Sequence, residues 1–287
     1  MLTILFDGIA YGMLLFVLAV GLAVTMGLMN FINLAHGAFA MAGGYITVLL
    51  MQRLNVPFLV CLPLAFAGAA LLGAVLERTL YRPLYRKPHL DQVLFSIGLV
   101  FMSVAAVDYY VGSTQQIIQL PAWLKGRTEI GSLGMGHYRL FIIAVCAALT
   151  VGLQYILAKT RFGSRLRASV DDQRVAAGLG INVNVVFLST FAFGSGLAGL
   201  GGALGAEVLG LDPSFPLKFM IYFLIVVAVG GTSSITGPLL AALLLGIADV
   251  AGKYYIPKMG AFIVYSLMIA ILLWRPNGLF VRQGGKA

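Results

Sequence analysis

The sequence predicts an all-α, polytopic membrane protein, a bundle of about eight or nine transmembrane helices that includes broken helices. Two observations predict this class. Of the 287 residues, 60% are hydrophobic and only 10% are charged, whereas a soluble domain is about 45–50% apolar and about 25% charged. The apolar residues also gather in runs of the length that crosses a bilayer, about 20 residues. Such a chain has too little polar surface to face water on all sides.

The candidate spans follow one another along the whole chain, so we expect residues 1–287 to form a single transmembrane domain. Each is interpreted as a helix, because only helices and closed barrels satisfy the backbone in lipid and the alternating pattern of barrel strands is absent. The first run carries Asp7 but no Lys or Arg. It therefore lacks the positive region of a secretory signal and is expected to stay as the first span. The spans cover roughly residues 5–29, 37–52, 57–77, 92–112, 139–158, 185–206, 217–231, 236–252 and 259–274.

Basic residues gather in two loops, residues 77–87 and 159–167, and in the tail after residue 274. Membrane proteins keep such loops on the cytoplasmic side. The pattern therefore predicts an external N-terminus, an external connection at residues 112–137 and a cytoplasmic C-terminus. It also accounts for the net charge of +9 as a topology signal, so we set nucleic-acid binding aside.

Two polar, glycine-containing breaks, residues 30–37 and 230–238, each end one span and begin the next. Paired breaks of this kind are typical of discontinuous helices along the translocation path of a transporter. The alternative is a tight turn at each break, with Asn33 or Thr236 as the N-cap and Pro238 in the first helical turn. The sequence leaves both interpretations open. On the first, the residues that border the path are Asn30, Asn33, His36, Thr232, Ser233 and Ser234.

Small residues recur at every fourth position in the span at residues 185–206. The run Gly194-Ser-Gly-Leu-Ala-Gly199 matches a dinucleotide-binding fingerprint, but it lies inside an apolar run with no strand before it. Small residues at this spacing instead let two helices approach closely. The predicted packing residues are Gly194, Ala198, Gly201, Gly202 and Gly205.

The sequence contains no P-loop and no metalloprotease, redox or serine-hydrolase motif, so we expect no enzymatic activity, cofactor or metal site. Three acidic residues fall near predicted span ends. Ionisable groups inside a membrane are functional candidates. We favour an interfacial position for Asp108 and Glu207 and leave Asp249 open.

The segment at residues 159–184 is polar and contains a short helix-forming core at residues 171–179. Two acidic residues favour the start of this helix, and Gly180 suits the position after its end. A short charged helix on the cytoplasmic side is well shaped to dock in a groove of a soluble partner. The alternative is a solvated loop that only sets topology, which would not explain the small residues at 176–178.

Three segments, residues 27–37, 167–183 and 230–238, together resemble the permeases of branched-chain amino acid importers of the LivH type. The resemblance covers nearly the whole chain. It implies a permease subunit of an ATP-binding-cassette importer in the bacterial inner membrane that carries branched-chain or other hydrophobic amino acids. It also implies a LivM-like second permease, two cytoplasmic ATPase subunits and a periplasmic substrate-binding protein. The coupling residues that it implies are Asp171, Asp172, Arg174, Ala176, Ala177, Gly178 and Gly180.

Two other functions stay open at this point. Permeases of this kind are expected to carry urea, short amides or organic acids as well, and the cargo is selected by a separate chain. An ion-coupled secondary transporter would show similar broken helices. It would bury a coupling carboxylate, for which Asp249 is the only serious candidate, and it would have no role for the segment at residues 171–180.

Overall fold

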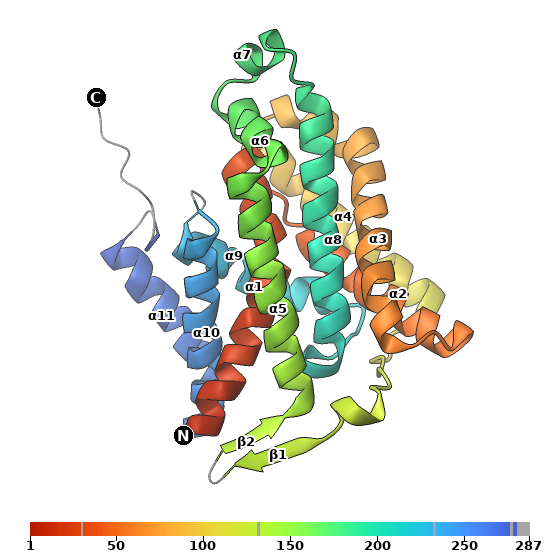
Figure 1. The fold of residues 1–287 in the computed structure, drawn as a ribbon, viewed down its shortest axis with the longest axis vertical. Helices are drawn as coiled ribbons and strands as arrows, with labels where there is room; N and C mark the ends of the chain where they lie inside the picture. Colours follow the sequence, from red (N-terminus) through yellow and green to blue (C-terminus); the bar gives the residue numbers. More distant parts are fainter. Residues whose placement is uncertain (30, 131–132, 232–233, 276–277, 280–287) are drawn as a thin grey trace.

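Helices account for most of the chain in this computed structural model, which describes residues 1–29, 31–130, 133–231, 234–275 and 278–279 (Figure 1). The long helices are α1 (Leu2–Met29), α2 (His36–Leu54), α3 (Phe58–Leu76), α4 (His89–Val111), α5 (His137–Lys159), α8 (Val183–Leu209), α9 (Phe215–Gly230), α10 (Thr236–Tyr255) and α11 (Gly260–Trp274). Two shorter helices, α6 (Arg161–Asp171) and α7 (Gln173–Gly178), connect α5 to α8.

The remaining elements are short. A π-helical turn (Glu77–Tyr81) and a 3-10 turn (Arg82–Arg86) join α3 to α4, and further 3-10 turns lie at Ala122–Leu124 and Pro257–Met259. Strands β1 (Arg127–Ile130) and β2 (Leu133–Gly136) form an antiparallel hairpin.

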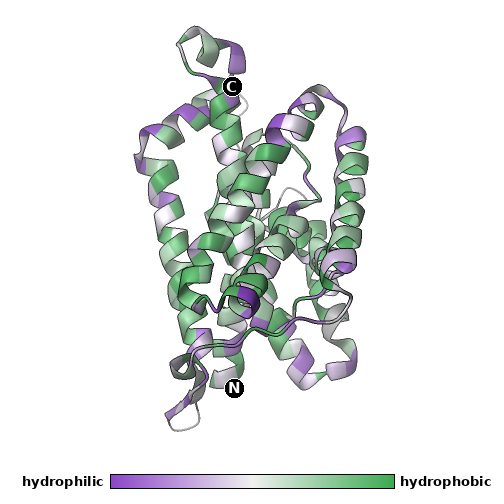
Figure 2. Ribbon diagram, turned by 90° about the vertical axis from the view of Figure 1, so that its right-hand side faces the viewer, coloured by the Kyte–Doolittle hydropathy of each residue, from purple (hydrophilic) through white to green (hydrophobic). Residues whose placement is uncertain are grey.

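The predicted membrane bundle is confirmed, because each predicted span matches one long helix to within a few residues. Within the described residues, six helical stretches are long and apolar enough to cross a membrane, α9 and α11 are apolar but shorter, and α2 belongs to neither group. The predicted count of eight or nine spans is therefore approximate. Hydrophilic residues concentrate toward the two ends of the molecule and hydrophobic residues in the middle (Figure 2). The chain is therefore a multi-pass membrane protein.

The two ends of the bundle carry different elements. The N-terminus and the β1–β2 hairpin lie at one end, and α7 lies at the opposite end (Figure 1). The predicted topology requires this arrangement, because it places the connection at residues 112–137 outside and the basic segment at residues 159–167 inside. We refer to the hairpin end as the external end and to the α7 end as the cytoplasmic end.

Helices α1 and α8 form the centre of the bundle. In the most apolar 18-residue stretch of each helix, 89% of the residues of α1 and 61% of those of α8 are buried. In α4 the share is only 17%. Helix α8 packs against α1, α2 and α3, and α1 packs against α10. The outer helices thus expose apolar side chains, as expected for surfaces that face lipid or another membrane subunit.

Glycines allow the backbones of α2 and α8 to meet. A Cβ atom added at Gly202 would lie 1.8 Å from the carbonyl oxygen of Ala40, and one added at Gly43 would lie 2.1 Å from the carbonyl oxygen of Gly199. On the α1 side, Gly201 faces Leu18 in the same way, with 2.9 Å to Cδ2. Among the other predicted packing residues, Gly194 faces Gly21, Gly205 faces Leu14, and Ala198 is fully buried.

We expect Gly202→Ala to destabilise the protein, because the added methyl group meets backbone that cannot move aside alone. Overpacking typically costs about 1–3 kcal/mol, which would lower the melting temperature in detergent by several degrees. The control is Gly98→Ala in α4, where an added Cβ has no atom within 4 Å. Equal melting temperatures for the two variants would show that the α2–α8 contact is not tight.

Candidate functional site

The first polar break lies between α1 and α2 and is buried. Asn30 lies outside the described residues, while Asn33 is 1% exposed and His36 is 2% exposed. The Asn33 Oδ1 atom accepts hydrogen bonds from the Ala35 N–H at 3.1 Å and from the Tyr81 hydroxyl at 3.0 Å. Its Nδ2 atom is buried and has no hydrogen-bond partner among the described residues. Asn33 thus orders the turn before α2 and keeps an unused donor.

His36 is the first residue of α2 and contacts two other helices. Its Nε2 atom lies 2.9 Å from the carbonyl oxygen of Leu18 in α1. Because a carbonyl oxygen only accepts, Nε2 carries the hydrogen. The ring also faces Phe223 of α9 edge-on, with 6.4 Å between centroids. An added Cβ at Gly21 would lie 2.6 Å from His36 Cε1, so this imidazole fits only because α1 has a glycine there.

An aromatic cluster encloses this break from the α3–α4 side. The ring of Phe31 packs edge-on against Tyr81 and Tyr85, each at 5.4 Å between centroids. Tyr81 also contacts Phe191 of α8 at 4.7 Å. These tyrosines are not among the predicted site residues, because the sequence of residues 77–87 indicates only a basic topology signal.

Gln92 is a second residue that the sequence analysis missed. It is 2% exposed, and its Oε1 atom accepts a hydrogen bond from the Ile32 N–H at 3.2 Å. Its Nε2 atom donates to the carbonyl oxygens of Leu84 at 3.3 Å and Lys87 at 3.1 Å. A glutamine near the start of a span looks solvated in the sequence, yet here it ties the first break to the loop before α4.

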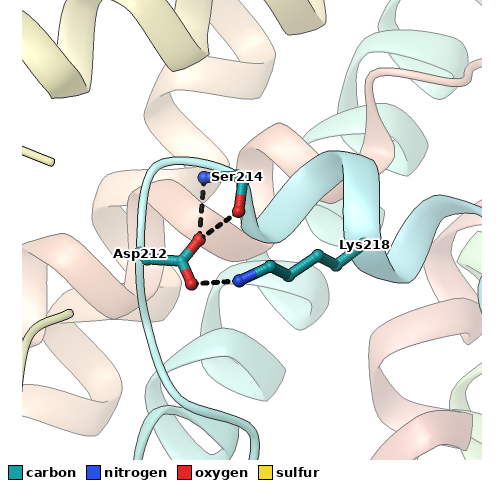
Figure 3. Close-up of polar contacts among 3 residues, drawn as sticks. All are labelled: Asp212, Ser214 and Lys218. Atoms are coloured by element: carbon teal, nitrogen blue, oxygen red, sulfur yellow. Dashed lines mark hydrogen bonds and ion pairs between the residues drawn. The ribbon is translucent and has the colours of Figure 1, made fainter. Parts of the chain in front are cut away.

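The start of α9 lies beside the start of α2. An added Cβ at Gly37 would lie 3.0 Å from Pro216 Cα. Just before α9, Asp212 Oδ1 accepts hydrogen bonds from the Ser214 N–H at 2.8 Å and the Ser214 hydroxyl at 2.5 Å, and Oδ2 pairs with Lys218 (Figure 3). This is an Asx turn that leads into the helix. Burial alone raises the pKa of Asp212, but the hydrogen bonds from Lys218 and Ser214 outweigh it and lower the pKa below its ordinary value.

The second break is only partly described, since Thr232 and Ser233 lie outside the described residues. Ser234 is half-buried, and its Oγ atom accepts hydrogen bonds at 3.3 Å from the Gly237 N–H and from the Thr236 hydroxyl. The side chain that accepts a hydrogen bond from the first turn of α10 is therefore Ser234, not the predicted N-cap Thr236. It lines a cavity of about 390 Å³ with the end of α1, with α5 and with α6. The described path candidates thus lie in two places, Asn33 and His36 at the first break and Ser234 near α6.

The coupling segment is two helices, not one helix that begins at residue 171. Asp171 ends α6, and Asp172 begins α7 as its N-cap, with Oδ1 accepting from the N–H groups of Arg174 at 2.8 Å and Val175 at 3.0 Å. The predicted start is therefore wrong by two residues, because Asp172 adopts an extended conformation that interrupts the helix. Gly180 has the positive φ of 81° that suits a glycine after a helix.

The remaining coupling residues divide between the inside and the outside of α7. Ala176 is 1% exposed, whereas Arg174, Ala177 and Gly178 are exposed. An added Cβ at Gly178 would have no atom within 4 Å. The outer face of α7 therefore presents small residues with free space in front of them.

We expect Asp212→Asn to lower the free energy of unfolding at pH 7 by about 1 kcal/mol, the usual net value of a hydrogen bond. Because the folded pKa is lowered, the stabilisation by Asp212 is present above the unfolded pKa of about 3.9 and is lost as the pH falls through the folded pKa. The melting temperatures of wild type and variant should therefore differ at pH 7 and converge as the pH falls below 4. A difference that does not depend on pH would contradict this role of the charge.

Comparison with known proteins identifies the family. The profile of the family "Branched-chain amino acid transport system / permease component" matches residues 4–272. The permease protein BraD of Pseudomonas aeruginosa is 28% identical over 97% of this chain and 95% of its own length. LivH of Escherichia coli K12 is 26% identical over 97% of this chain and 94% of its own length, and LivM of the same organism is 25% identical over 93% and 68%. No solved structure matches the chain. The chain belongs to the family of branched-chain amino acid transport system permeases.

Proposed function

We propose that this chain is one of two pore-forming permease subunits of an ATP-driven importer in a bacterial cytoplasmic membrane, and that it carries branched-chain or other hydrophobic amino acids. The observation that carries the proposal is the family match over residues 4–272, in a chain with the matching helical architecture. The relatives are called high-affinity branched-chain amino acid transport system permease proteins. These names favour amino acids over urea, short amides and organic acids.

The proposed importer needs partners that supply energy and substrate. The sequence has no P-loop, so ATP hydrolysis is assigned to two separate ATPase subunits on the cytoplasmic face. The similarity to both LivH and LivM supports pairing with a LivM-like second permease. A periplasmic binding protein would deliver the amino acid at the external end. Residues 1–287 would then form a single permease domain, with residues 159–184 as its coupling segment.

Helix α7 is the segment that we assign to ATPase docking. It lies at the end of the molecule away from the hairpin (Figure 1), and its outer face is open at Ala177 and Gly178. Helix α6 fixes it to the bundle, because an added Cβ at Gly163 would lie 2.1 Å from the carbonyl oxygen of Leu157 in α5. A movement imposed on α7 would therefore pass into α5.

Asn33 and His36 are the described residues that we place along the translocation path at the first break. Asn33 lies in the turn before α2 and His36 is the first residue of α2, next to the start of α9. Two helix N-termini at one place offer unpaired N–H groups and partial positive charge, which favour a substrate carboxylate. The unused Nδ2 donor of Asn33 has the same preference.

The proposed function is tested by reconstituting the chain in proteoliposomes with its second permease, ATPases and binding protein. We expect leucine uptake that requires ATP on the cytoplasmic side and binding protein on the external side, and leucine-loaded binding protein should stimulate ATP hydrolysis. In the same assay, Asn33→Ala and His36→Ala should lower uptake without loss of assembly. Uptake driven by an ion gradient without ATP would instead identify a secondary transporter.

We expect Gly178→Leu to weaken ATPase docking while leaving the membrane bundle intact. The chain itself has room for the side chain, so a clash can arise only in the partner's groove. A small-to-large change in a packed site costs about 1–3 kcal/mol, or about a five- to 150-fold loss of affinity. Co-purification of the ATPase and stimulated ATP hydrolysis measure this. The control is Gly152→Leu in α5, where an added Cβ also meets no atom within 4 Å. If Gly178→Leu retained full ATP-coupled transport, α7 would not be the docking site for the ATPase, and its segment would only set the topology.

A further inference from the structure

A charged cavity of about 320 Å³ lies in the external half of the bundle, apart from the polar breaks. It is bounded by α1, α5, α8, α9 and α10. Its polar lining is Asp7, Tyr11, Arg139, Asp249 and Lys253. The depth of Asp249 could not be predicted from the sequence, and in the structure this residue is buried, with 1% of its surface exposed.

The four charged residues form two ion pairs with a net charge of zero. Arg139 at the start of α5 pairs with Asp7 Oδ2 of α1. Lys253 Nζ lies 2.5 Å from Asp249 Oδ2 within α10. Each pair occupies only one oxygen of its carboxylate. A cavity with both signs of charge in equal number suits a ligand that is itself zwitterionic.

Both carboxylates keep an oxygen free. Asp249 Oδ1 and Asp7 Oδ1 are buried and have no hydrogen-bond partner among the described residues. The Tyr222 hydroxyl is close enough to the Asp249 carboxylate to act as a side-chain hydrogen-bond donor, but Oδ1 has no partner at ordinary hydrogen-bond geometry among the described residues. A buried carboxylate oxygen without a donor is unfavourable, because it has lost its hydrogen bonds to water and has gained none from the protein. An ammonium group would supply three donors at this place.

The cations also have donors left for a carboxylate. Arginine has five N–H donors and lysine has three. Among the described residues, Arg139 and Lys253 each form one ion pair, and Lys253 Nζ also faces the Tyr11 ring at 5.6 Å from its centroid. The rest of the cavity wall is apolar and would suit an aliphatic side chain. This wall comprises Ala10, Leu14, Ile142, Val208, Leu209, Phe219 and Val250.

A second cavity of about 580 Å³ lies under the β1–β2 hairpin and adjoins the first. The two share Asp7, Arg139 and Val208 as lining residues. The Asp7–Arg139 ion pair therefore stands at the junction between an outer chamber and an inner one. A small molecule released at the hairpin would meet this pair before it reached Asp249.

We propose that the inner cavity binds a zwitterionic α-amino acid with an apolar side chain on its way from the external face into the bundle. The ammonium group binds the free oxygens of Asp249 and Asp7, and the carboxylate binds Arg139 and Lys253. The choice of an aliphatic amino acid rests on the proposed function, whereas the requirement for a zwitterion rests on the cavity itself. Its volume lies at the lower end of the range for small-molecule sites, about 300–1,000 Å³.

The test measures binding of radiolabelled leucine to the assembled permease pair with its ATPases in nanodiscs, without binding protein. Competitors are leucinamide, which lacks the carboxylate, and 4-methylpentanoate, which lacks the amino group. Leucine should bind at least about tenfold more tightly than either analogue. Asp249→Asn should weaken leucine binding roughly ten- to 100-fold, the effect of one hydrogen bond to a charged group. The control is Asp108→Asn, an exposed carboxylate near the external end of α4, which should leave leucine binding unchanged.

A second variant separates the two ends of the ligand. Arg139→Gln should reduce the preference for leucine over leucinamide, because only Lys253 is left for the carboxylate. Asp249→Asn should instead reduce the preference over 4-methylpentanoate, because only Asp7 is left for the ammonium group. Co-purification with the second permease verifies assembly of each variant. Absence of leucine binding to wild type, equal binding of the analogues, or wild-type binding by both variants would each overturn the site. Loss of the proposed function looks different, because the complete wild-type transporter would then import no hydrophobic amino acid at all.

Discussion

The close approach of α8 to its neighbours is the contact on which the rest of the structure depends. Helix α8 meets α1, α2 and α3 along small residues, and the backbone of Gly202 lies directly against Ala40. Within a membrane, helix association relies on such close packing, because lipid is as apolar as the side chains. The first turns of α2 pack between α8 on one side and α9 on the other. The polar break before α2 can be buried only because this packing closes around it.

The buried polar groups are consistent with that constraint. Inside a bundle, each polar atom needs a partner from the protein, since water is scarce. His36 hydrogen-bonds to the Leu18 carbonyl oxygen, and Gln92 hydrogen-bonds to three backbone groups. Five buried side-chain atoms of the described residues have no hydrogen-bond partner, and two of them, the hydroxyls of Tyr45 and Ser169, lie elsewhere in the bundle. The other three, Asn33 Nδ2 and the Oδ1 atoms of Asp7 and Asp249, lie at the first break and at the charged cavity. These are the places where a passing substrate could supply the missing partner.

Much of the bundle follows from the sequence, because run length and hydropathy alone identify the long helices. The small-residue spacing also pointed to α8 as a packing helix. Three features were missed for physical reasons. The interruption at Asp172 depends on an extended residue inside a helix-forming run, which composition does not reveal. The roles of Tyr81 and Gln92 depend on contacts between segments far apart in the chain. The depth of Asp249 depends on how α10 turns toward α1.

Helix α5 connects the two functional ends of the molecule without interruption. It carries Arg139 at its external end and passes at Thr160 directly into α6, which leads to α7. Its 23 residues extend over about 35 Å at 1.5 Å per residue. A rod of this length acts as a lever: a tilt of about 10° around its middle displaces the two tips by roughly 3 Å in opposite directions. In the proposed importer, a push on α7 would thereby shift Arg139 relative to Asp7, so that a change of nucleotide on the cytoplasmic side would alter this ion pair on the external side.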